Sequence, residues 1–415
     1  MAAATYVAAR IVGTWELYLL SIAFLAAVVV SWVLVVSASR RLAATRALSP
    51  SQPTSGDELI VTFRVSNGSQ LPGLLVTLRE ATGDLGPRPQ TIEFASLGSL
   101  QERSLASAAL PARRGVHHLP ALWAEAEDPL GLVRARRRLG EPLEVTIYPR
   151  LVDLSSCALF ANVGVLRGLS RRGLVRLGSS EFRGIRPHYP GEPLSHVDWK
   201  ATAKTGNLML REMDDPESGD ITVLLDGTAA QVAGDPARSN FELAVEAAGS
   251  VADFVLAAGR SVNLLVHDGG WRPTRLAPGV GGHRRLLDTL AGVKANAGAP
   301  LSAALPRLRS TGSRLARTQT LAVVALSLDA ELVRVLIALR RDGLQVSVVH
   351  IAADSFSRIA TDSFSRTVTH PRDDAGLLVA LAAAGVLSLT LRRGDDLRSA
   401  LSLARAERSL AEQPR

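Results

Sequence analysis

Residues 221–226, with the sequence ITVLLD, form a short apolar run that ends in an acidic residue. A helical spacing of apolar residues follows from Phe241 to Ala258, and SVNLLVH (261–267) is a second apolar run. Short apolar strands that alternate with amphipathic helices are typical of βαβ units, in which helices cover both faces of a parallel sheet. The sequence therefore predicts an α/β domain with a mostly parallel, Rossmann-type sheet over residues 219–395.

The same alternation continues towards the C-terminus. It predicts helices at 283–293 and 330–341, strands at 318–327, 345–351 and 386–391, and a charged helix in the C-terminal segment 396–415.

Upstream of this domain the hydrophobic pattern changes to a period of two. The run ELIVTFRVSNGS (58–69) alternates apolar and polar residues up to an Asn-Gly turn, and GLLVTLREA (73–81) repeats the pattern. Short strands at such spacing predict an antiparallel β-sandwich-like domain over residues 58–149. Its further strands are expected at 90–94, 101–110, 116–127, 132–139 and 142–148, and the polar run SPSQPTSGD (49–57) is interpreted as a linker.

The N-terminal part contains twenty consecutive uncharged residues, LYLLSIAFLAAVVVSWVLVV (17–36). At 1.5 Å per residue this run spans about 30 Å, the thickness of the hydrocarbon core of a bilayer. A cleavable signal peptide is the alternative, but the run is longer than an ordinary signal sequence and Arg40-Arg41 follow it. Residues 1–48 are therefore predicted to be an N-terminal tail and a single transmembrane helix.

The charges that flank this helix predict its orientation. Arg40, Arg41 and Arg46 outnumber Arg10 on the other side, so the positive-inside rule places the C-terminal bulk in the cytoplasm. The single cysteine, Cys157, allows no intrachain disulfide, which agrees with a reducing compartment. An extracytoplasmic receptor or adhesion protein is the alternative.

The overall composition argues against nucleic-acid binding. The formal net charge is +8, but the arginines are scattered and aromatic residues make up only 4% of the chain. A platform on which bases could stack is therefore not expected.

Residues 150–218 are predicted to be a connector between the two domains. Within it, residues 178–217 are dense in charged and aromatic groups. Glu181, His188, Ser195, His196, Asp198 and Lys200 could supply a base, an orienting group and a nucleophile. A hydrolase centred on His188 and Asp198 is therefore an alternative.

The other interpretation of residues 178–217 is structural. It has Trp199 as a buried anchor and Arg186, Asp198 and Lys200 in internal ion pairs, and we expect no catalytic residue. The pair His117-His118 is also expected to be structural, because adjacent strand residues point to opposite faces.

The run EFRGIRPHYPGEPLSHVDWKATAKTGNLMLREMDDPE (181–217) resembles the signature of bacterial domain-of-unknown-function family 58. Two positions depart from the family pattern: His188 stands where tyrosine is usual, with Tyr189 one place late, and Ser195 replaces the usual arginine. The run DPLGL (128–132) resembles a second family segment. The matching signature residues are Glu181, Phe182, Ile185, Arg186, Gly191, Glu192, Val197, Asp198, Trp199, Lys200, Thr202, Ala203 and Lys204.

This resemblance implies that the C-terminal domain is similar to a von Willebrand factor A domain, which carries a metal-ion-dependent adhesion site at the carboxyl ends of its strands. Such a site needs Asp-x-Ser-x-Ser after the first strand and hard oxygen ligands from later loops. Here Asp226 and Thr228 keep oxygen ligands, Ala230 has none, and Asp329 is similar to the last acidic ligand. The resemblance therefore implies a degenerate magnesium site formed by Asp226, Thr228 and Asp329, and no required cofactor.

Members of this family resemble partners of MoxR-type AAA+ ATPases. The leading hypothesis is thus a membrane-anchored, non-enzymatic interaction and assembly factor. Its α/β domain is expected to dock such an ATPase or an unknown client protein.

Overall fold

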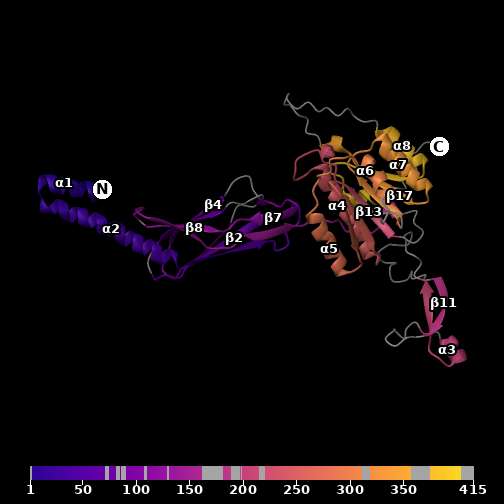
Figure 1. Cartoon of the computed structure of the whole chain (residues 1–415), viewed down its shortest axis with the longest axis horizontal. Coiled ribbons are helices and arrows are strands. Elements are labelled where there is room, and N and C mark those ends of the chain that lie inside the picture. Colours follow the sequence, from indigo (N-terminus) through magenta and orange to yellow (C-terminus); the bar gives the residue numbers. More distant parts are fainter. Residues whose placement is uncertain are drawn as a thin grey trace. The chain divides into compact units, whose positions relative to one another are not determined.

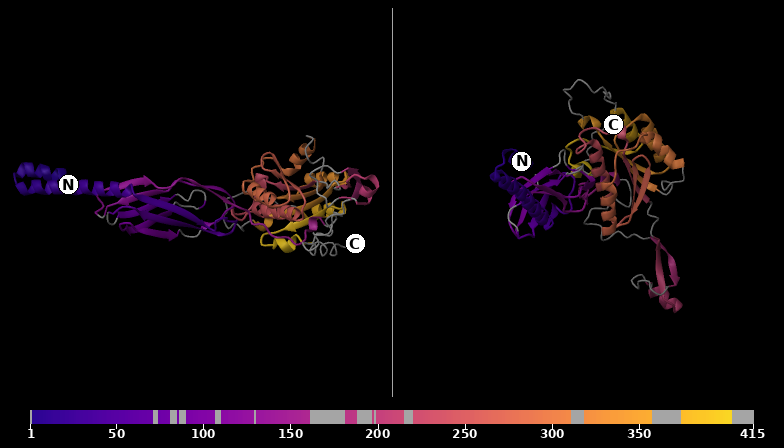
Figure 2. Two further views of the ribbon diagram at one scale, coloured as in Figure 1. Left: turned by 90° about the horizontal axis from the view of Figure 1, so that it is seen from below. Right: turned by 60° about the vertical axis from the view of Figure 1, so that its left-hand side comes forward.

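The structure is a computed structural model that describes residues 2–70, 74–80, 85, 90–106, 110–128, 130–160, 181–187, 197, 199–214, 220–310, 318–356 and 374–402. The chain divides into two compact units, Met1–Arg150 and Leu151–Arg415 (Figures 1 and 2). Each unit has its own hydrophobic core and is described by itself.

The first unit begins with two packed helices, α1 (Ala2–Val12) and α2 (Trp15–Ser39). The expected N-terminal tail is therefore helical. The two helices run antiparallel, because the rings of Tyr6 and Tyr18 lie 5.7 Å apart and the Ser21 hydroxyl donates to the Ala2 carbonyl. Helix α2 contains the predicted apolar run, and among the described residues it is the one helix long and apolar enough to cross a membrane.

The rest of the first unit consists of antiparallel β-strands. One sheet has the order β1-β2-β5, with β6 also paired to β2; a second has the order β4-β3-β8-β9; and β7 pairs with β10. Val61, Phe63 and Val65 of β2 pack against Val76 and Leu78 of β3, as two facing sheets require. The predicted β-sandwich-like domain is thus confirmed. The strands are β1 (Leu42–Ser49), β2 (Glu58–Asn67), β3 (Leu74–Glu80), β4 (Gln90–Leu97), β5 (Glu102–Ala106), β6 (Leu110–Pro111), β7 (Gly115–Leu119), β8 (Trp123–Glu127), β9 (Arg134–Arg138) and β10 (Leu143–Ile147).

The β-domain starts earlier than the sequence indicated. Strand β1, assigned to the tail and anchor, pairs with β2 along its whole length, from Leu42 opposite Asn67 to Ser49 opposite Ile60. The stretch interpreted as a linker is an ordered connection between β1 and β2, since Ser55 N donates to the Tyr148 carbonyl. The covered face of β1 contains Leu42, Leu48 and the polar Arg46, whereas its exposed face is made of small residues such as Ala43 and Ala47, so the contrast that shows a period of two is missing from the sequence.

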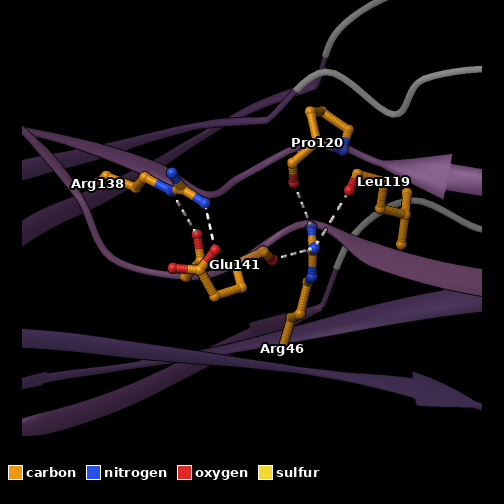
Figure 3. Close-up of polar contacts among 6 residues, drawn as sticks. Arg46, Leu119, Pro120, Arg138 and Glu141 are labelled. Atoms are coloured by element: carbon orange, nitrogen blue, oxygen red, sulfur yellow. Dashed lines mark hydrogen bonds and ion pairs between the residues drawn. The ribbon is translucent and has the colours of Figure 1, made fainter.

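Arg46 of β1 connects this strand to two distant loops (Figure 3). Its guanidinium donates to the carbonyls of Pro120 and Glu141 over 3.0 and 2.8 Å. Beside it, Arg138 forms an ion pair with the Glu141 side chain. Arg46, which counted as a positive flank of the membrane helix, is therefore engaged within the β-domain.

The histidine pair of β7 behaves as its strand position predicts. His117 is buried and its Nε2 lies 2.8 Å from the Arg113 carbonyl, whereas His118 is exposed and lies 3.7 Å from Glu144. The two rings point to opposite faces of the strand, so they do not share a ligand.

The second unit contains a six-stranded sheet of order β15-β14-β13-β16-β17-β18, which is parallel except for the edge strand β15. This is the doubly wound order, and it confirms the predicted α/β, von Willebrand factor A-like fold class. The strands are β13 (Asp220–Asp226), β14 (Val262–His267), β15 (Trp271–Leu276), β16 (Thr318–Ala325), β17 (Gln345–Ile351) and β18 (Leu387–Leu391), and the helices are α4 (Asn240–Ala257), α5 (Val280–Ala291), α6 (Leu301–Ser310), α7 (Ala330–Arg341), α8 (Asp374–Ala383) and α9 (Leu397–Ala400).

The two faces of this sheet carry separate cores. Val223 and Leu225 of β13 belong to the core under α4 and α5, whereas Leu224 belongs to the core under α6, α7 and α8 (Figure 1). Because neighbouring strand residues point to opposite faces, a continuous apolar run is needed to cover both. Residues 151–160, placed in the connector by the sequence, pack into the first core through residues such as Leu154 and Phe160.

The signature stretch forms a hairpin of β11 (Glu181–Pro187) and β12 (Met209–Asp214), with α3 (Trp199–Thr205) between them (Figure 1). Trp199 is 69% exposed and Lys200 is exposed, so the expectation of a buried tryptophan anchor is wrong. Helix α3 contacts β12 of its own hairpin, and none of its residues is buried.

Candidate site at the carboxyl ends of the sheet

The predicted site residues follow the carboxyl ends of the two central strands. Asp226 is the last residue of β13, and Asp329 precedes helix α7 shortly after β16. The chain order along the sheet reverses between β13 and β16, and such a switch point is where doubly wound sheets form their crevices. The sequence prediction therefore falls on the edge that the topology favours.

Asp226 and Thr228 interact directly, and both are buried. Oδ1 of Asp226 accepts hydrogen bonds from the Thr228 hydroxyl over 2.6 Å and from the Thr228 amide over 3.0 Å. Its Oδ2 accepts from the Leu326 amide over 3.2 Å, which ties the end of β13 to the end of β16. Both oxygens of this carboxylate are thus occupied by groups of the chain.

Asp329 makes a different set of contacts. Its Oδ1 accepts from the Leu332 amide over 2.7 Å, which caps the N-terminus of α7. Its Oδ2 accepts from the hydroxyl of Ser302, in the first turn of α6, over 2.9 Å. Asp329 therefore joins two helices on the same face of the sheet.

The end of β14 adds two polar residues to this edge. Nε2 of the buried His267 lies 2.9 Å from the Ala299 carbonyl, so that nitrogen carries the proton and donates. Oδ2 of the buried Asp268 lies 3.1 Å from Nε of Arg272. Within the described part of the chain, the second ring nitrogen of His267 and Oδ1 of Asp268 have no hydrogen-bond partner.

Gly227 allows the loops after β13 and β14 to approach closely. A Cβ at this position would lie 2.4 Å from the His267 carbonyl oxygen, closer than real Cβ contacts. The Gly227 carbonyl accepts from the Ala297 amide, and the Ala297 carbonyl accepts from the Ala229 amide. Three backbone segments therefore meet at this site, and only a glycine at position 227 leaves enough space for them.

The structure joins some of the predicted site residues and leaves others apart. Asp226 and Thr228 are in contact, and Thr228 Oγ1 lies 3.5 Å from the Ala299 carbonyl. Asp329 instead contacts Ser302 and Leu332. Among the described residues, no three His, Cys, Asp or Glu side chains gather into a group that could hold a metal. Asp226 and Thr228 are the two predicted ligands whose oxygens lie together, and the hydrogen bond from the Thr228 hydroxyl to Oδ1 of Asp226 joins them directly.

Sequence reasoning missed Ser302 and His267. The chain offers Ala299-Pro300-Leu301 where an adhesion site would offer a threonine, and Ser302 comes one residue later. A hydroxyl at the start of a helix is a recognisable signal, although its pairing with Asp329 requires the fold. His267 ends a buried strand, which is the same signal that singled out Asp226.

The residues of the hydrolase alternative, His188, Ser195, His196 and Asp198, lie outside the described residues, as do the signature positions Gly191 and Glu192. Glu181, Phe182, Ile185 and Arg186 lie in β11, Val197 is buried, and Trp199, Lys200, Thr202, Ala203 and Lys204 lie in α3.

Part of the sequence matches a described protein family. Residues 184–356 match the family described as "Protein of unknown function DUF58". The match covers the signature from Ile185 onward and most of the α/β sheet; it does not reach Glu181, Phe182 or the DPLGL run. No curated protein matches the sequence.

Solved structures similar to this chain have low identities. The VWA domain of SpRpn10 is 11% identical with a TM-score of 0.29, and the likeness covers 44% of this chain and 92% of that domain. An aerotolerance-related membrane protein from Bacteroides fragilis NCTC 9343, carrying multiple mutations to serines, is 12% identical with a TM-score of 0.31; the likeness covers 47% of this chain and 99% of that protein. The bacterial hydrophobin BslA is 11% identical with a TM-score of 0.19, and the likeness covers 27% of this chain and 97% of BslA.

Proposed function

We propose that this chain is a membrane-anchored, non-enzymatic interaction and assembly factor whose α/β domain docks a protein partner at the carboxyl ends of β13 and β16. The partner class is a MoxR-type AAA+ ATPase, as the family resemblance implies. The soluble domains are placed in the cytoplasm, because the exposed Arg40 and Arg41 directly follow helix α2.

The observation that carries this proposal is that the two carboxylates at the switch point, Asp226 and Asp329, are both hydrogen-bonded to groups of the chain. The carboxylate oxygens of Asp226 and of Asp329 all accept hydrogen bonds from amides or hydroxyls of the chain itself. Such carboxylates shape loops rather than act as a base or as the core of an open metal site. What they shape is an exposed rim, formed by Ala229, Ala230 and Val232, that a partner can reach.

The anchor is supported by the surface of α2. Its side chains include many large exposed apolar residues, and soluble proteins rarely leave so large an apolar surface uncovered. The length of 25 residues is enough to span a bilayer.

The docking face can be tested with one charged substitution and a matched control. Ala230→Arg places a long cation on the rim at the carboxyl ends of the strands. Ala257→Arg makes the same change at the last residue of α4, which is also exposed but lies before β14, at the amino ends. We expect Ala230→Arg to weaken ATPase binding by about tenfold, or about 1.4 kcal/mol, and Ala257→Arg to leave it unchanged.

The measurement is co-purification of the full-length protein with the MoxR-type ATPase, with and without nucleotide, followed by titration. Equal binding by both variants would refute the rim as the docking face. A reporter fused to the C-terminus tests orientation: its export would overturn both the cytoplasmic placement and the ATPase partnership. Turnover of a hydrolase substrate that is lost on His188→Ala with Asp198→Ala, while folding is retained, would favour the enzyme alternative.

A further inference from the structure

The turn between β8 and β9 is fixed by one buried carboxylate. Asp128 is 2% exposed, and its Oδ1 accepts from the Val133 amide over 2.7 Å. Its Oδ2 accepts from the Leu130 amide over 3.1 Å and from the hydroxyl of Ser31 over 3.2 Å. Since Ser31 belongs to α2, this turn is attached to the predicted membrane helix itself.

A second contact shows how α2 runs beside the β-domain. Arg137 of β9 donates through Nη1 to the Ser39 carbonyl over 2.6 Å, at the last residue of α2. Between these two contacts, Val35 and Ala38 of the helix are fully buried in the sandwich core. The final turns of α2 therefore lie along β9, with the Asp128 turn at the end nearer the centre of the helix.

The contact with Ser31 fixes the position of the turn along the apolar run of α2. Ser31 lies five residues before Val36, the last residue of the predicted apolar run, which is about 7.5 Å along the helix axis. Peripheral apolar groups that sit at a membrane surface reach about 5–10 Å into the boundary between headgroups and acyl chains. The turn thus lies at the level of that boundary.

The side chains that the turn presents are apolar and uncovered. Leu130 is 71% exposed and Leu132 is 48% exposed. Gly131, between them, has a φ of +69° and its amide donates to the Asp128 carbonyl, so the turn holds both leucines outward. On the helix, Trp32 next to Ser31 is 57% exposed, which continues the apolar surface at the same level.

We propose that Leu130 and Leu132 form a second membrane contact, which enters the interface of the lipid bilayer beside α2. The lipid is the occupant because the turn that carries these leucines is attached to α2 through Ser31, and the next residue of the helix, Trp32, is exposed. Arg40 and Arg41, exposed just beyond the helix, add positive charge that favours anionic headgroups. This inference rests on the proposed membrane anchor, and the experiment below separates the two.

The test uses variants of the full-length protein, each with one added cysteine at an exposed position that is labelled with the fluorophore NBD. The native Cys157 need not be removed, because burial raises the pKa of its thiol to about 12 and keeps it unreactive. The labelled positions are Leu130→Cys, Leu132→Cys and Val28→Cys on α2. The control position is the exposed Val116→Cys on β7, a strand at the end of the β-domain away from α2 (Figure 1). The proteins are reconstituted into phosphatidylcholine–phosphatidylglycerol vesicles with or without brominated acyl chains.

We expect brominated lipid to quench the labels at 28, 130 and 132, with a shift of their emission to shorter wavelength, and to leave the label at 116 unaffected. Quenching at 28 without quenching at 130 and 132 would overturn the second contact and leave the anchor intact. Absence of quenching at 28 would overturn the anchor, and the second contact with it. Quenching at 116 as well would show non-specific adsorption of the β-domain and would also overturn the proposal.

Discussion

The hydroxyl of Ser302 donates to Oδ2 of Asp329 over 2.9 Å and so joins the first turn of α6 to the cap of α7. The same carboxylate holds the Leu332 amide through its other oxygen. One residue thus stabilises two neighbouring helices, which have a common core beneath them. A residue that resembles an adhesion-site ligand acts here as a structural joint.

Removing this joint should destabilise the α/β domain. We expect Asp329→Ala to lower the free energy of unfolding by about 1–2 kcal/mol, because an N-cap and a charge-assisted hydrogen bond are both lost. Ser302→Ala should cost less, and in a double-mutant cycle the two changes should couple. Thermal unfolding of the full-length protein in detergent measures both. Additive effects of the two substitutions would show that the contact contributes nothing.

The occupied oxygens of Asp226 also make a prediction about magnesium. We expect millimolar magnesium to leave the melting temperature of the full-length protein unchanged, because a ligand stabilises a protein only if it binds the folded state. Asp226→Asn serves as the control. A magnesium-dependent rise in melting temperature that this substitution abolishes would contradict our interpretation and restore the adhesion-type site.

The buried Asp128 predicts a dependence of stability on pH. Burial by itself raises the pKa of Asp128, but the hydrogen bonds from the amides of Val133 and Leu130, and from Ser31, outweigh it, so the pKa is lowered. A lowered folded-state pKa contributes stability above the unfolded value of about 3.9, and this contribution is lost as the pH falls through the folded value. The first unit should therefore lose stability as the pH falls below about 4.

The measurement is hydrogen exchange of the β-domain amides between pH 7 and pH 3. In Asp128→Asn the acid-dependent loss should be smaller and the stability at pH 7 lower. An identical pH profile in the two proteins would remove Asp128 as its source.

Two adjacent glycines of α5 offer a matched pair. A Cβ on Gly282 would lie 1.7 Å from the Ala277 carbonyl oxygen, whereas a Cβ on Gly281 would meet nothing within 4 Å. Gly282→Ala should destabilise the domain by about 1–3 kcal/mol through overpacking, or more if the helix cannot shift. Gly281→Ala should stabilise it by about 0.5–1 kcal/mol, because alanine reduces the entropy of the unfolded chain at a helical position. The opposite order of melting temperatures would mean that α5 does not begin where it is placed.

Hydrophobic periodicity was enough to predict the α/β domain, because the central parallel strands, such as β13 and β14, are buried on both faces and have apolar sequences. It was not enough for β15, which contains Pro273 and exposed arginines, since an edge strand buries little. The turn Asp268-Gly269-Gly270 before it was the available signal. Likewise, β1 was not recognised because Arg46 interrupts its covered face and small residues such as Ala43 and Ala47 occupy its exposed face.

The position of the candidate site could be predicted from the sequence, but the hydrogen bonds that its carboxylates accept could not. Asp226 ends an apolar strand, and strand ends in such sheets are where ligands meet. That its oxygens are occupied depends on Leu326, one hundred residues away, and on Thr228 turning its hydroxyl inward. The exposure of Trp199 was predicted incorrectly, because α3 contacts β12 of its own hairpin and none of its residues is buried.

Helix α2 passes into β1 with only Arg40 and Arg41 between them, and the Arg41 carbonyl accepts from the Gly68 amide. No flexible segment separates α2 from the sandwich. In the proposed membrane-anchored arrangement, a torque applied to the β-domain is therefore transmitted to the helix, and the sandwich keeps a fixed height relative to the bilayer. Inserting a Gly-Ser segment after Arg41 would uncouple the two while leaving each folded.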